Sequence, residues 1–197
     1  MEEYELNNIK KIINKDGIIV IPTETVYGVG TSVYSDEGIK KLYEVKKRDK
    51  NKSISVLVSN YSMIEELTSE ISAIEKKIID NFFPGPLTIL LKKGKNVSNE
   101  LTSNNYIGIR MPNHKLALSI IDKCGPLATT SANISGMESE IKIDNIRNIF
   151  GDKVDYYVDG GICKYGIGST IILVENNKIN LIREGSISLD TINNKIE

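Results

Sequence analysis

The sequence contains little of what several common kinds of protein site require. Its 197 residues include two cysteines, one histidine and no tryptophan. Two cysteines are too few for a disulfide framework, and without a Cys/His cluster the sequence predicts no zinc site. No stretch approaches the roughly 20 apolar residues of a transmembrane helix, so we expect no membrane association. The first residues, MEEYEL, lack the basic and apolar regions of a secretory signal, which favours a cytoplasmic location.

An excess of one charge is also absent. The chain carries 25 Lys and Arg against 26 Asp and Glu, a net charge of −1. A stand-alone nucleic-acid-binding protein usually has a basic excess, because phosphate neutralisation supplies most of its non-specific affinity. The balance argues against such a role, although Lys46, Lys47, Arg48, Lys50 and Lys52 form a local basic cluster. With 40% hydrophobic residues, a chain of this length is expected to bury one core and form a single domain over residues 1–197.

Apolar periodicity predicts helices mixed with strands. Leu6, Ile9 and Ile13 recur at helical spacing, and further helices are expected after Ser35, at the Ser62-x-x-Glu65 capping box, over 71–82, after Asn113, over 144–150 and from Ser188. Strands are expected over 17–21, 53–59, 87–91, 106–111, 126–130 and 154–158, with 169–175 and 178–183 forming a hairpin closed by Asn176-Asn177. Because strict alternation is absent and one connection is a hairpin, the pattern predicts a three-layer α/β fold with a mixed, twisted sheet.

The segment PTETVYGVG, residues 22–30, is the most informative part of the chain. It follows an apolar run, residues 17–21, that is typical of a buried strand ended by proline. Hydroxyls, a carboxylate, a tyrosine and two glycines then lie together where the strand is expected to pass into a loop. Glycine allows backbone N–H groups to approach a ligand closely, so the segment predicts a binding loop.

Five further polar motifs follow in order: KKR at 46–48, PGPLT at 84–88, RMP at 110–112, SANISG at 131–136, and GST at 168–170 followed by REG at 183–185. Together with PTETVYGVG, this set resembles the YrdC-like family of L-threonylcarbamoyladenylate synthases. The resemblance extends from about residue 5 to residue 188, and the six motifs are in register. It implies a single α/β domain with a concave basic cleft beside the sheet.

The resemblance also implies an activity. Family members join L-threonine, bicarbonate or CO2, and ATP into threonylcarbamoyl-AMP and release diphosphate, for threonylcarbamoyladenosine modification of tRNA. Mg²⁺ is expected with ATP because it neutralises the phosphates. The implied partner is the tRNA threonylcarbamoyl transferase complex, with at most a weak contact to tRNA itself. Since the reactants are largely anionic, such a site needs cations and backbone donors more than a strong base.

The site residues follow from the matching motif positions. L-threonine contacts are implied for Thr25, Arg110, Thr129 and Ser169, and ATP contacts for Arg48, Lys52, Tyr106, Ser131, Ser139 and Arg183. Lys46 and Arg48 are expected to align the reactants and stabilise charge, with no covalent or acid–base catalyst and no protein-held metal. Arginine suits these positions because its planar guanidinium donates two parallel hydrogen bonds to a carboxylate or phosphate.

The chain departs from the family pattern in its basic element. Family members usually have prolines after the arginine and near the following strand, where this chain has Asp49 and Ser53. Leu57 stands where some members place a histidine on the threonine side. We therefore expect a more flexible loop between Arg48 and Lys52.

Two other interpretations stay open at this stage. A YrdC-like module can form a carbamoyl adenylate from carbamoyl phosphate, as in hydrogenase maturation factors, and YciO-like paralogues share the scaffold. From another class, the basic cleft would suit an RNA-binding module whose affinity falls steeply with salt and needs no ATP. The near-neutral charge and the lack of an aromatic-rich stripe argue against the RNA-binding alternative.

Overall fold

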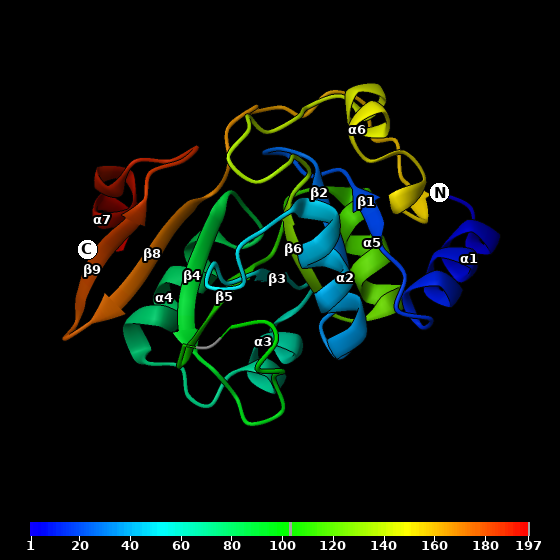
Figure 1. The fold of residues 1–197 in the computed structure, drawn as a ribbon. Helices are drawn as coiled ribbons and strands as arrows, with labels where there is room; N and C mark the ends of the chain where they lie inside the picture. Colours follow the sequence, from blue (N-terminus) through cyan, green and yellow to red (C-terminus); the bar gives the residue numbers. More distant parts are fainter. Residues whose placement is uncertain (103, 197) are drawn as a thin grey trace.

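The computed structural model describes residues 1–102 and 104–196, so residues 103 and 197 of the predicted domain lie outside the described part. The described residues form one sheet with the strand order β7-β1-β2-β6-β3-β5-β4-β8-β9 (Figure 1). The strands are β1 (Ile19–Ile21), β2 (Gly28–Ser32), β3 (Ser55–Leu57), β4 (Leu87–Lys92), β5 (Tyr106–Arg110), β6 (Leu127–Ser131), β7 (Tyr156–Tyr157), β8 (Thr170–Glu175) and β9 (Lys178–Arg183).

The helices are α1 (Glu3–Ile13), α2 (Asp36–Lys46), α3 (Tyr61–Leu67), α4 (Ala73–Phe82), α5 (Lys115–Cys124), α6 (Ile143–Phe150) and α7 (Leu189–Ile196), with the 3-10 turn η1 (Gly151–Lys153). Figure 1 shows α1 beside β1 at one end of the molecule and α7 beside β9 at the other. None of the helices within the described residues is both long and apolar enough to cross a membrane.

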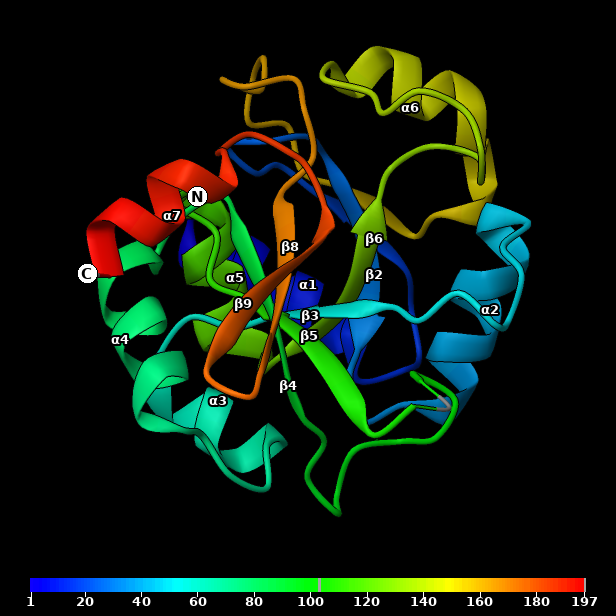
Figure 2. The same cartoon turned by 90° about the vertical axis from the view of Figure 1, so that its left-hand side faces the viewer.

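The sheet is mixed, as predicted. Five strand pairs are antiparallel and three are parallel: β1 with β7, β3 with β5, and β4 with β8. Figure 2 shows the strands fanning out around the centre, which is the expected twist. The β8–β9 hairpin is confirmed, because Asn176 and Asn177 both adopt left-handed φ values, 52° and 58°, as a two-residue turn requires.

The two faces of the sheet carry different kinds of side chain. One row runs across five strands through Ala128, Val56, Ile109, Ile89 and Ile172, all fully buried. Side chains from α2, α3, α4, α6 and α7 belong to the same apolar core. Because successive side chains alternate between faces, the neighbouring positions of these strands lie on the opposite face.

The opposite face has two parts. At its β1 end, Ile19 and Ile21 pack with residues of α1 and α5 in a second apolar core. Toward its middle the strands carry small or polar residues, among them Thr129 on β6, Ser55 on β3 and Thr88 on β4. This small, polar strip is where the candidate site lies.

The segment Gly28–Gly30, predicted as a loop, belongs instead to strand β2. β2 pairs with β6 in the centre of the sheet, and Gly30 lies opposite Thr129. A Cβ atom on Gly30 would lie 2.5 Å from the carbonyl oxygen of Ala128, so only glycine fits. Close strand packing beside the site therefore explains the glycines of this motif, and the prediction of a loop over Gly28–Gly30 was wrong.

Several predicted element ends are also wrong. Asn60, and not Ser62, caps α3 by accepting from Met63 N, and the capping box forms at Ser72 and Glu75 of α4. The N-cap position of α5 is His114, one residue beyond the predicted Asn113, and it makes no side-chain capping bond. The strand expected over 53–59 is limited to Ser55–Leu57, and that over 154–158 to Tyr156–Tyr157.

Candidate functional site

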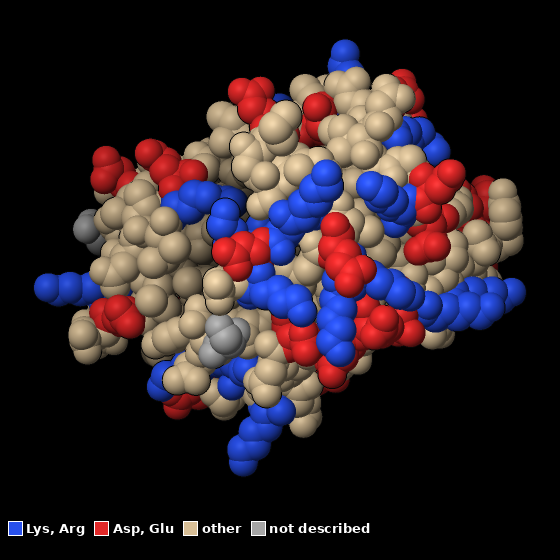
Figure 3. Space-filling view, viewed as in Figure 1, with Lys and Arg blue, Asp and Glu red and all other residues tan. Residues whose placement is uncertain are grey.

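A cavity of about 190 Å³ opens on the small, polar strip of the sheet. Strands β2, β3, β4, β5, β6, β8 and β9 all contribute to its lining, together with the loops that follow β1, α2, β6 and β7. Arg48, Arg110 and Arg183 line it with the hydroxyls of Thr23, Ser53, Ser55, Thr88, Thr129, Thr130, Ser131, Ser139 and Ser169. Figure 3 shows basic and acidic side chains intermixed on one face of the molecule, so the positive charge of the cavity is a local feature.

The three arginines come from distant parts of the chain. Arg48 follows α2, Arg110 ends β5 and Arg183 ends β9. Burial lowers the pKa of Arg183, and the positive charges of Arg110 and Arg48 lower it further. The three guanidinium groups therefore lie close enough to repel one another, and an anion bound among them would relieve that repulsion.

Arg110 is paired with a buried carboxylate. Its Nη2 lies 2.8 Å from Oε2 of Glu24, and its Nε donates to the carbonyl oxygen of Gly85 at 3.2 Å. Both side chains of the pair are more than nine-tenths buried. The contact is an ion pair without well-aligned hydrogen-bond geometry, and Oε1 of Glu24 makes no hydrogen bond to a described residue. Burial lowers the pKa of Arg110, while Glu24 acts in the opposite direction.

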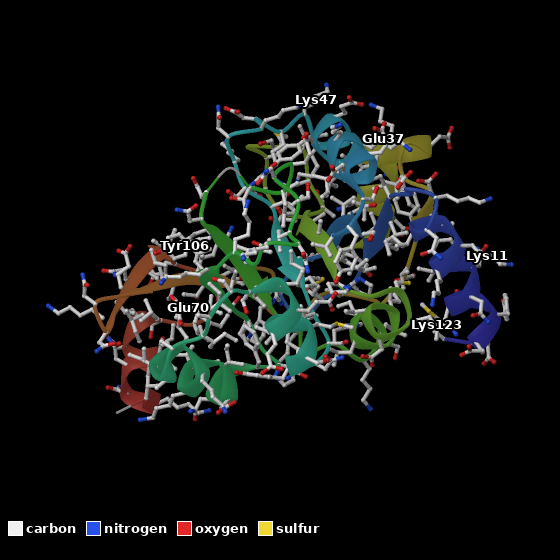
Figure 4. The ribbon with its side chains drawn as sticks, turned by 90° about the horizontal axis from the view of Figure 1, so that it is seen from below. Lys11, Glu37, Lys47, Glu70, Tyr106 and Lys123 are labelled. Carbon is white, nitrogen blue, oxygen red and sulfur yellow. The ribbon has the colours of Figure 1, made fainter. Side chains whose placement is uncertain are left out.

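Arg48 is held by the backbone of the loop that follows it. Lys47 adopts the left-handed conformation, φ 49°, and ends α2, so the chain turns immediately before Arg48 (Figure 4). The Nε of Arg48 then donates to the carbonyl of Lys52 at 3.0 Å, and its Nη2 to the carbonyl of Ser53 at 2.8 Å. The remaining N–H groups are available to a ligand in the cavity.

Arg183 and the loop before β8 form a third group of donors. Nη2 of Arg183 donates to the carbonyl of Ser169 at 2.7 Å. The hydroxyl of Ser169 lies 2.7 Å from that of Thr88, which is 2% exposed. Thr88 is a cavity residue that the sequence interpretation missed, and its signal was present in the PGPLT motif, which it ends.

Lys46 lies behind the cavity and does not line it. Its side chain is 1% exposed, and Nζ donates to the carbonyl of Ser131 and to Oδ1 of Asn133. Asn133 in turn donates to the carbonyl of Met137 at 2.7 Å. Lys46 thus supports the turn that carries Ser131 and Ser139. Burial, with the charge of Arg48, lowers the pKa of Lys46 to about 7.

Of the predicted contact residues, the structure brings Arg48, Arg110, Thr129, Ser131, Ser139, Ser169 and Arg183 to one cavity. It does not bring Thr25, Lys52 or Tyr106 there. Thr25 is fully buried and its hydroxyl bonds to that of Thr23, which lines the cavity in its place. The carbonyl of Lys52 accepts hydrogen bonds from Arg48 and from the hydroxyl of Tyr43, but Lys52 does not line the cavity.

Tyr106 lies at the opposite end of β5 from Arg110. The two residues share a face of the strand but lie roughly 13 Å apart along it. Tyr106 lines a separate hollow with Glu70 and Lys92, and Figure 4 shows Tyr106 and Glu70 on the same side of the molecule. The position of Tyr106 does not support the ATP contact that the resemblance implied.

The lining of the cavity is unsuited to a protein-held metal ion. Within the described residues, no group of three or more His, Cys, Asp or Glu side chains could hold a cation. The described cavity lining supplies hydroxyls, guanidinium groups and carbonyls, whereas Mg²⁺ prefers carboxylates. A magnesium ion in this cavity would therefore be bound mainly by the phosphates of a nucleotide.

Comparison with known proteins places these features in a family. Residues 11–185 match the Sua5/YciO/YrdC family model, whose description is "Telomere recombination". A Methanocaldococcus jannaschii protein named "Putative threonylcarbamoyl-AMP synthase" is 40% identical over 200 residues, which cover 96% of this chain and 94% of that protein. The threonylcarbamoyl-AMP synthase of Pyrococcus abyssi is 30% identical over 194 residues, and this chain spans 57% of its length.

Solved structures agree. The crystal structure of P. abyssi Sua5 complexed with L-threonine superposes with a TM-score of 0.96 at 30% identity, covering 100% of this chain and 58% of that one. Escherichia coli YciO, at 22% identity and a TM-score of 0.88, shares the fold. The predicted fold class and family are thus confirmed. The chain belongs to the Sua5/YciO/YrdC family.

Proposed function

We propose that this protein is a threonylcarbamoyl-AMP synthase, a nucleotidyltransferase that forms threonylcarbamoyl-AMP and diphosphate from L-threonine, bicarbonate or CO2, and ATP. The observation that carries the proposal is the convergence of Arg48, Arg110 and Arg183 on one cavity lined with hydroxyls. The relative from M. jannaschii, which this chain covers almost completely, bears the name of that activity.

The cavity suits the chemistry of this reaction. The amine of L-threonine adds to CO2 and loses a proton, giving an N-carboxylate. An oxygen of that carboxylate attacks the α-phosphorus of ATP, the bond to the β-phosphate oxygen breaks, and diphosphate leaves. Both anionic groups must be held in line against their mutual repulsion, which fixed guanidinium groups can achieve.

The two substrates occupy opposite ends of the cavity in this proposal. L-threonine lies at the Arg110 end, with Thr23, Thr129 and Ser169 near it, and its carboxylate binds the free N–H groups of Arg110. The nucleotide lies toward the Arg48 and Arg183 end, where the hydroxyls of Ser131 and Ser139 are available. Mg²⁺ enters with ATP as part of the substrate, because the lining supplies few ligands for it.

The biological setting follows from the same reaction. The product serves threonylcarbamoyladenosine modification of tRNA, so the functional partner is a tRNA threonylcarbamoyl transferase complex in the cytoplasm. A direct tRNA contact would be weak, since the chain has a net charge of −1. Residues 1–197 act as a single YrdC-like domain.

The test is an incubation with MgATP, bicarbonate and L-threonine, followed by measurement of diphosphate and mass-spectrometric detection of threonylcarbamoyl-AMP. Diphosphate release should depend on L-threonine and on bicarbonate. A parallel reaction with carbamoyl phosphate in place of both substrates tests the paralogous activity. Diphosphate release that is independent of L-threonine, or that requires carbamoyl phosphate, would overturn the assignment.

Two variants separate the ends of the cavity. Arg48→Ala should weaken ATP binding more than tenfold and leave the Kd for L-threonine within about threefold, because one charged hydrogen-bond donor contributes roughly 1.5–3 kcal/mol. Arg110→Ala should show the reverse pattern. Equal losses of both substrates in both variants would argue against the proposed division of the cavity.

A further inference from the structure

The three arginines of the cavity differ in their carboxylate partners. Arg110 lies 2.8 Å from Glu24, whereas neither Arg48 nor Arg183 has a carboxylate within ion-pair distance among the residues that the structure describes. Both of the latter instead donate to backbone carbonyls. The cavity therefore has one end where the positive charge is offset and another where it is not.

Stability alone does not explain why the Glu24–Arg110 ion pair is buried. Removing two charges from water is costly, and a buried ion pair often contributes little more than an apolar pair of the same volume. Glu24 is 7% exposed and Arg110 is 6% exposed. In addition, Oε1 of Glu24 has no hydrogen-bond partner in the described residues, so the arrangement is not optimised for stability alone.

The pair leaves Arg110 able to bind one carboxylate. Of the five guanidinium N–H groups, only the Nε–H donates a hydrogen bond, to the carbonyl of Gly85, while Nη2 lies 2.8 Å from Glu24 as an ion pair. The Nη1 group on the side away from this contact stays available, together with Nη2, for the two parallel bonds that a carboxylate accepts. The guanidinium group is held on two edges, so its orientation toward the cavity is fixed before a ligand arrives.

We propose that Glu24 keeps the two substrates at separate ends of the cavity, by offsetting the charge of Arg110 so that this end accepts the carboxylate of a zwitterionic amino acid and excludes phosphate groups. The inference rests on the proposed function, and it identifies Glu24 as the residue that keeps L-threonine and the nucleotide apart. A polyphosphate carries several negative charges and gains most where the positive charge is not offset, at Arg48 and Arg183. It is repelled by the carboxylate beside Arg110, whereas an amino acid has no net charge to be repelled.

Without such sorting the cavity would hold phosphates at both ends. Three uncompensated guanidinium groups would attract diphosphate or a triphosphate across the whole site, and L-threonine would compete with it. Because the two reactants must be bound together for transfer, competition at the Arg110 end would block the reaction. Glu24 is thus a specificity-determining residue that acts through Arg110.

The experiment measures L-threonine binding by calorimetry with and without saturating inorganic diphosphate. For the wild-type protein the Kd for L-threonine should change less than about threefold, because diphosphate stays at Arg48 and Arg183. For Glu24→Gln, which keeps the size of the side chain, diphosphate should raise the apparent Kd for L-threonine at least tenfold. Glu24→Asp restores the charge and should recover simultaneous binding.

A matched control distinguishes Glu24 from a general change in charge. Glu138 is exposed in the loop next to Ser139, and Glu138→Gln removes the same charge near the cavity. This variant should behave as the wild type does. Nucleotide binding by Glu24→Gln verifies that its cavity remains folded.

The outcomes separate this inference from the function on which it rests. Diphosphate that competes with L-threonine in the wild-type protein overturns the sorting role, whether or not the variants fold. Simultaneous binding that persists in Glu24→Gln also overturns it, while the proposed function stands. A wild-type protein that binds no L-threonine at all overturns the proposed function and this inference with it.

Discussion

The buried amine of Lys46 leads to a prediction about stability and pH. Nζ lies in the interior, where it contacts the carbonyl of Ser131 and Oδ1 of Asn133 and is 1% exposed. Burial lowers its pKa from 10.5 to about 7, and the charge of Arg48 acts in the same direction. The folded protein therefore holds this proton less tightly than the unfolded chain does.

The sign of the effect follows from proton linkage. Below about pH 7 the amine is charged in both states, and the full cost of burying the charge is present. Between about pH 7 and 10.5 only the unfolded chain keeps the proton, so the free energy of unfolding rises with pH. Above this window both forms are neutral and the cost is gone. The slope within the window is at most about 1.4 kcal/mol per pH unit, or roughly 5 kcal/mol over its whole width.

The assay is urea unfolding of wild type and Lys46→Met at about pH 7.5 and pH 9.0. Methionine fills similar space without a titrating group, so the stability of wild type relative to the variant should increase by about 1–2 kcal/mol between the two pH values. Other titrating groups contribute equally to both proteins and cancel in the difference. Lys41→Met, which removes an exposed lysine from the same helix, should show no such change.

A wild-type advantage that is independent of pH would refute this account, because it would mean that Lys46 remains charged in the folded protein throughout the range. The same result would leave the contacts of Lys46 with Ser131 and Asn133 as ordinary charged hydrogen bonds. The measurement thus tests the buried environment of the amine separately from its structural role.

Three further substitutions test the placement of other residues. Thr88→Val removes the hydroxyl partner of Ser169 and should weaken L-threonine binding about fivefold without changing ATP binding, as measured by calorimetry; an unchanged Kd for L-threonine would contradict this. Tyr106→Phe should leave the KM for ATP within about twofold, and a large increase would place Tyr106 back among the ATP contacts. Gly30→Ala brings a Cβ to within 2.5 Å of the Ala128 carbonyl and should lower the free energy of unfolding by about 2 kcal/mol or more; a neutral effect would show that β2 can shift away from β6.

The parts of the fold that follow from local pattern could be predicted from the sequence. The β8–β9 hairpin needed only two alternating runs and an Asn-Asn turn, and α4 needed only its apolar spacing. Strand β2 could not be recognised, because Gly28 and Gly30 look like loop residues until the neighbouring strand β6 is known. What selects glycine there is a contact about 100 residues away, which periodicity does not report.

The residues of the site also divide into those that the sequence predicted correctly and those that it did not. Arg48, Arg110 and Arg183 were found through their motifs, and the structure brings all three to one cavity. Tyr106 was included because it stands where the family has an ATP contact, but in the structure it lines a separate hollow with Glu70 and Lys92. The motif predicted Thr25 at the cavity, whereas the structure places Thr23 there. The two hydroxyls are hydrogen-bonded neighbours, and local backbone geometry, which composition does not determine, decides which of them lines the cavity.

The charge of the cavity shows most clearly why composition was a poor guide to this site. A net charge of −1 predicts no affinity for polyanions, yet three guanidinium groups converge on one cavity lined mainly by residues with hydroxyl groups. Acidic side chains are intermixed with basic ones on the face shown in Figure 3, and only Glu24 among the described residues reaches an arginine of the cavity at ion-pair distance. Because Coulomb interactions weaken with distance and with screening by water, a bound anion responds to the nearest buried charges and not to the total. The position of that single carboxylate, 86 residues before its partner in the chain, therefore determines how the positive charge is divided between the two ends of the cavity.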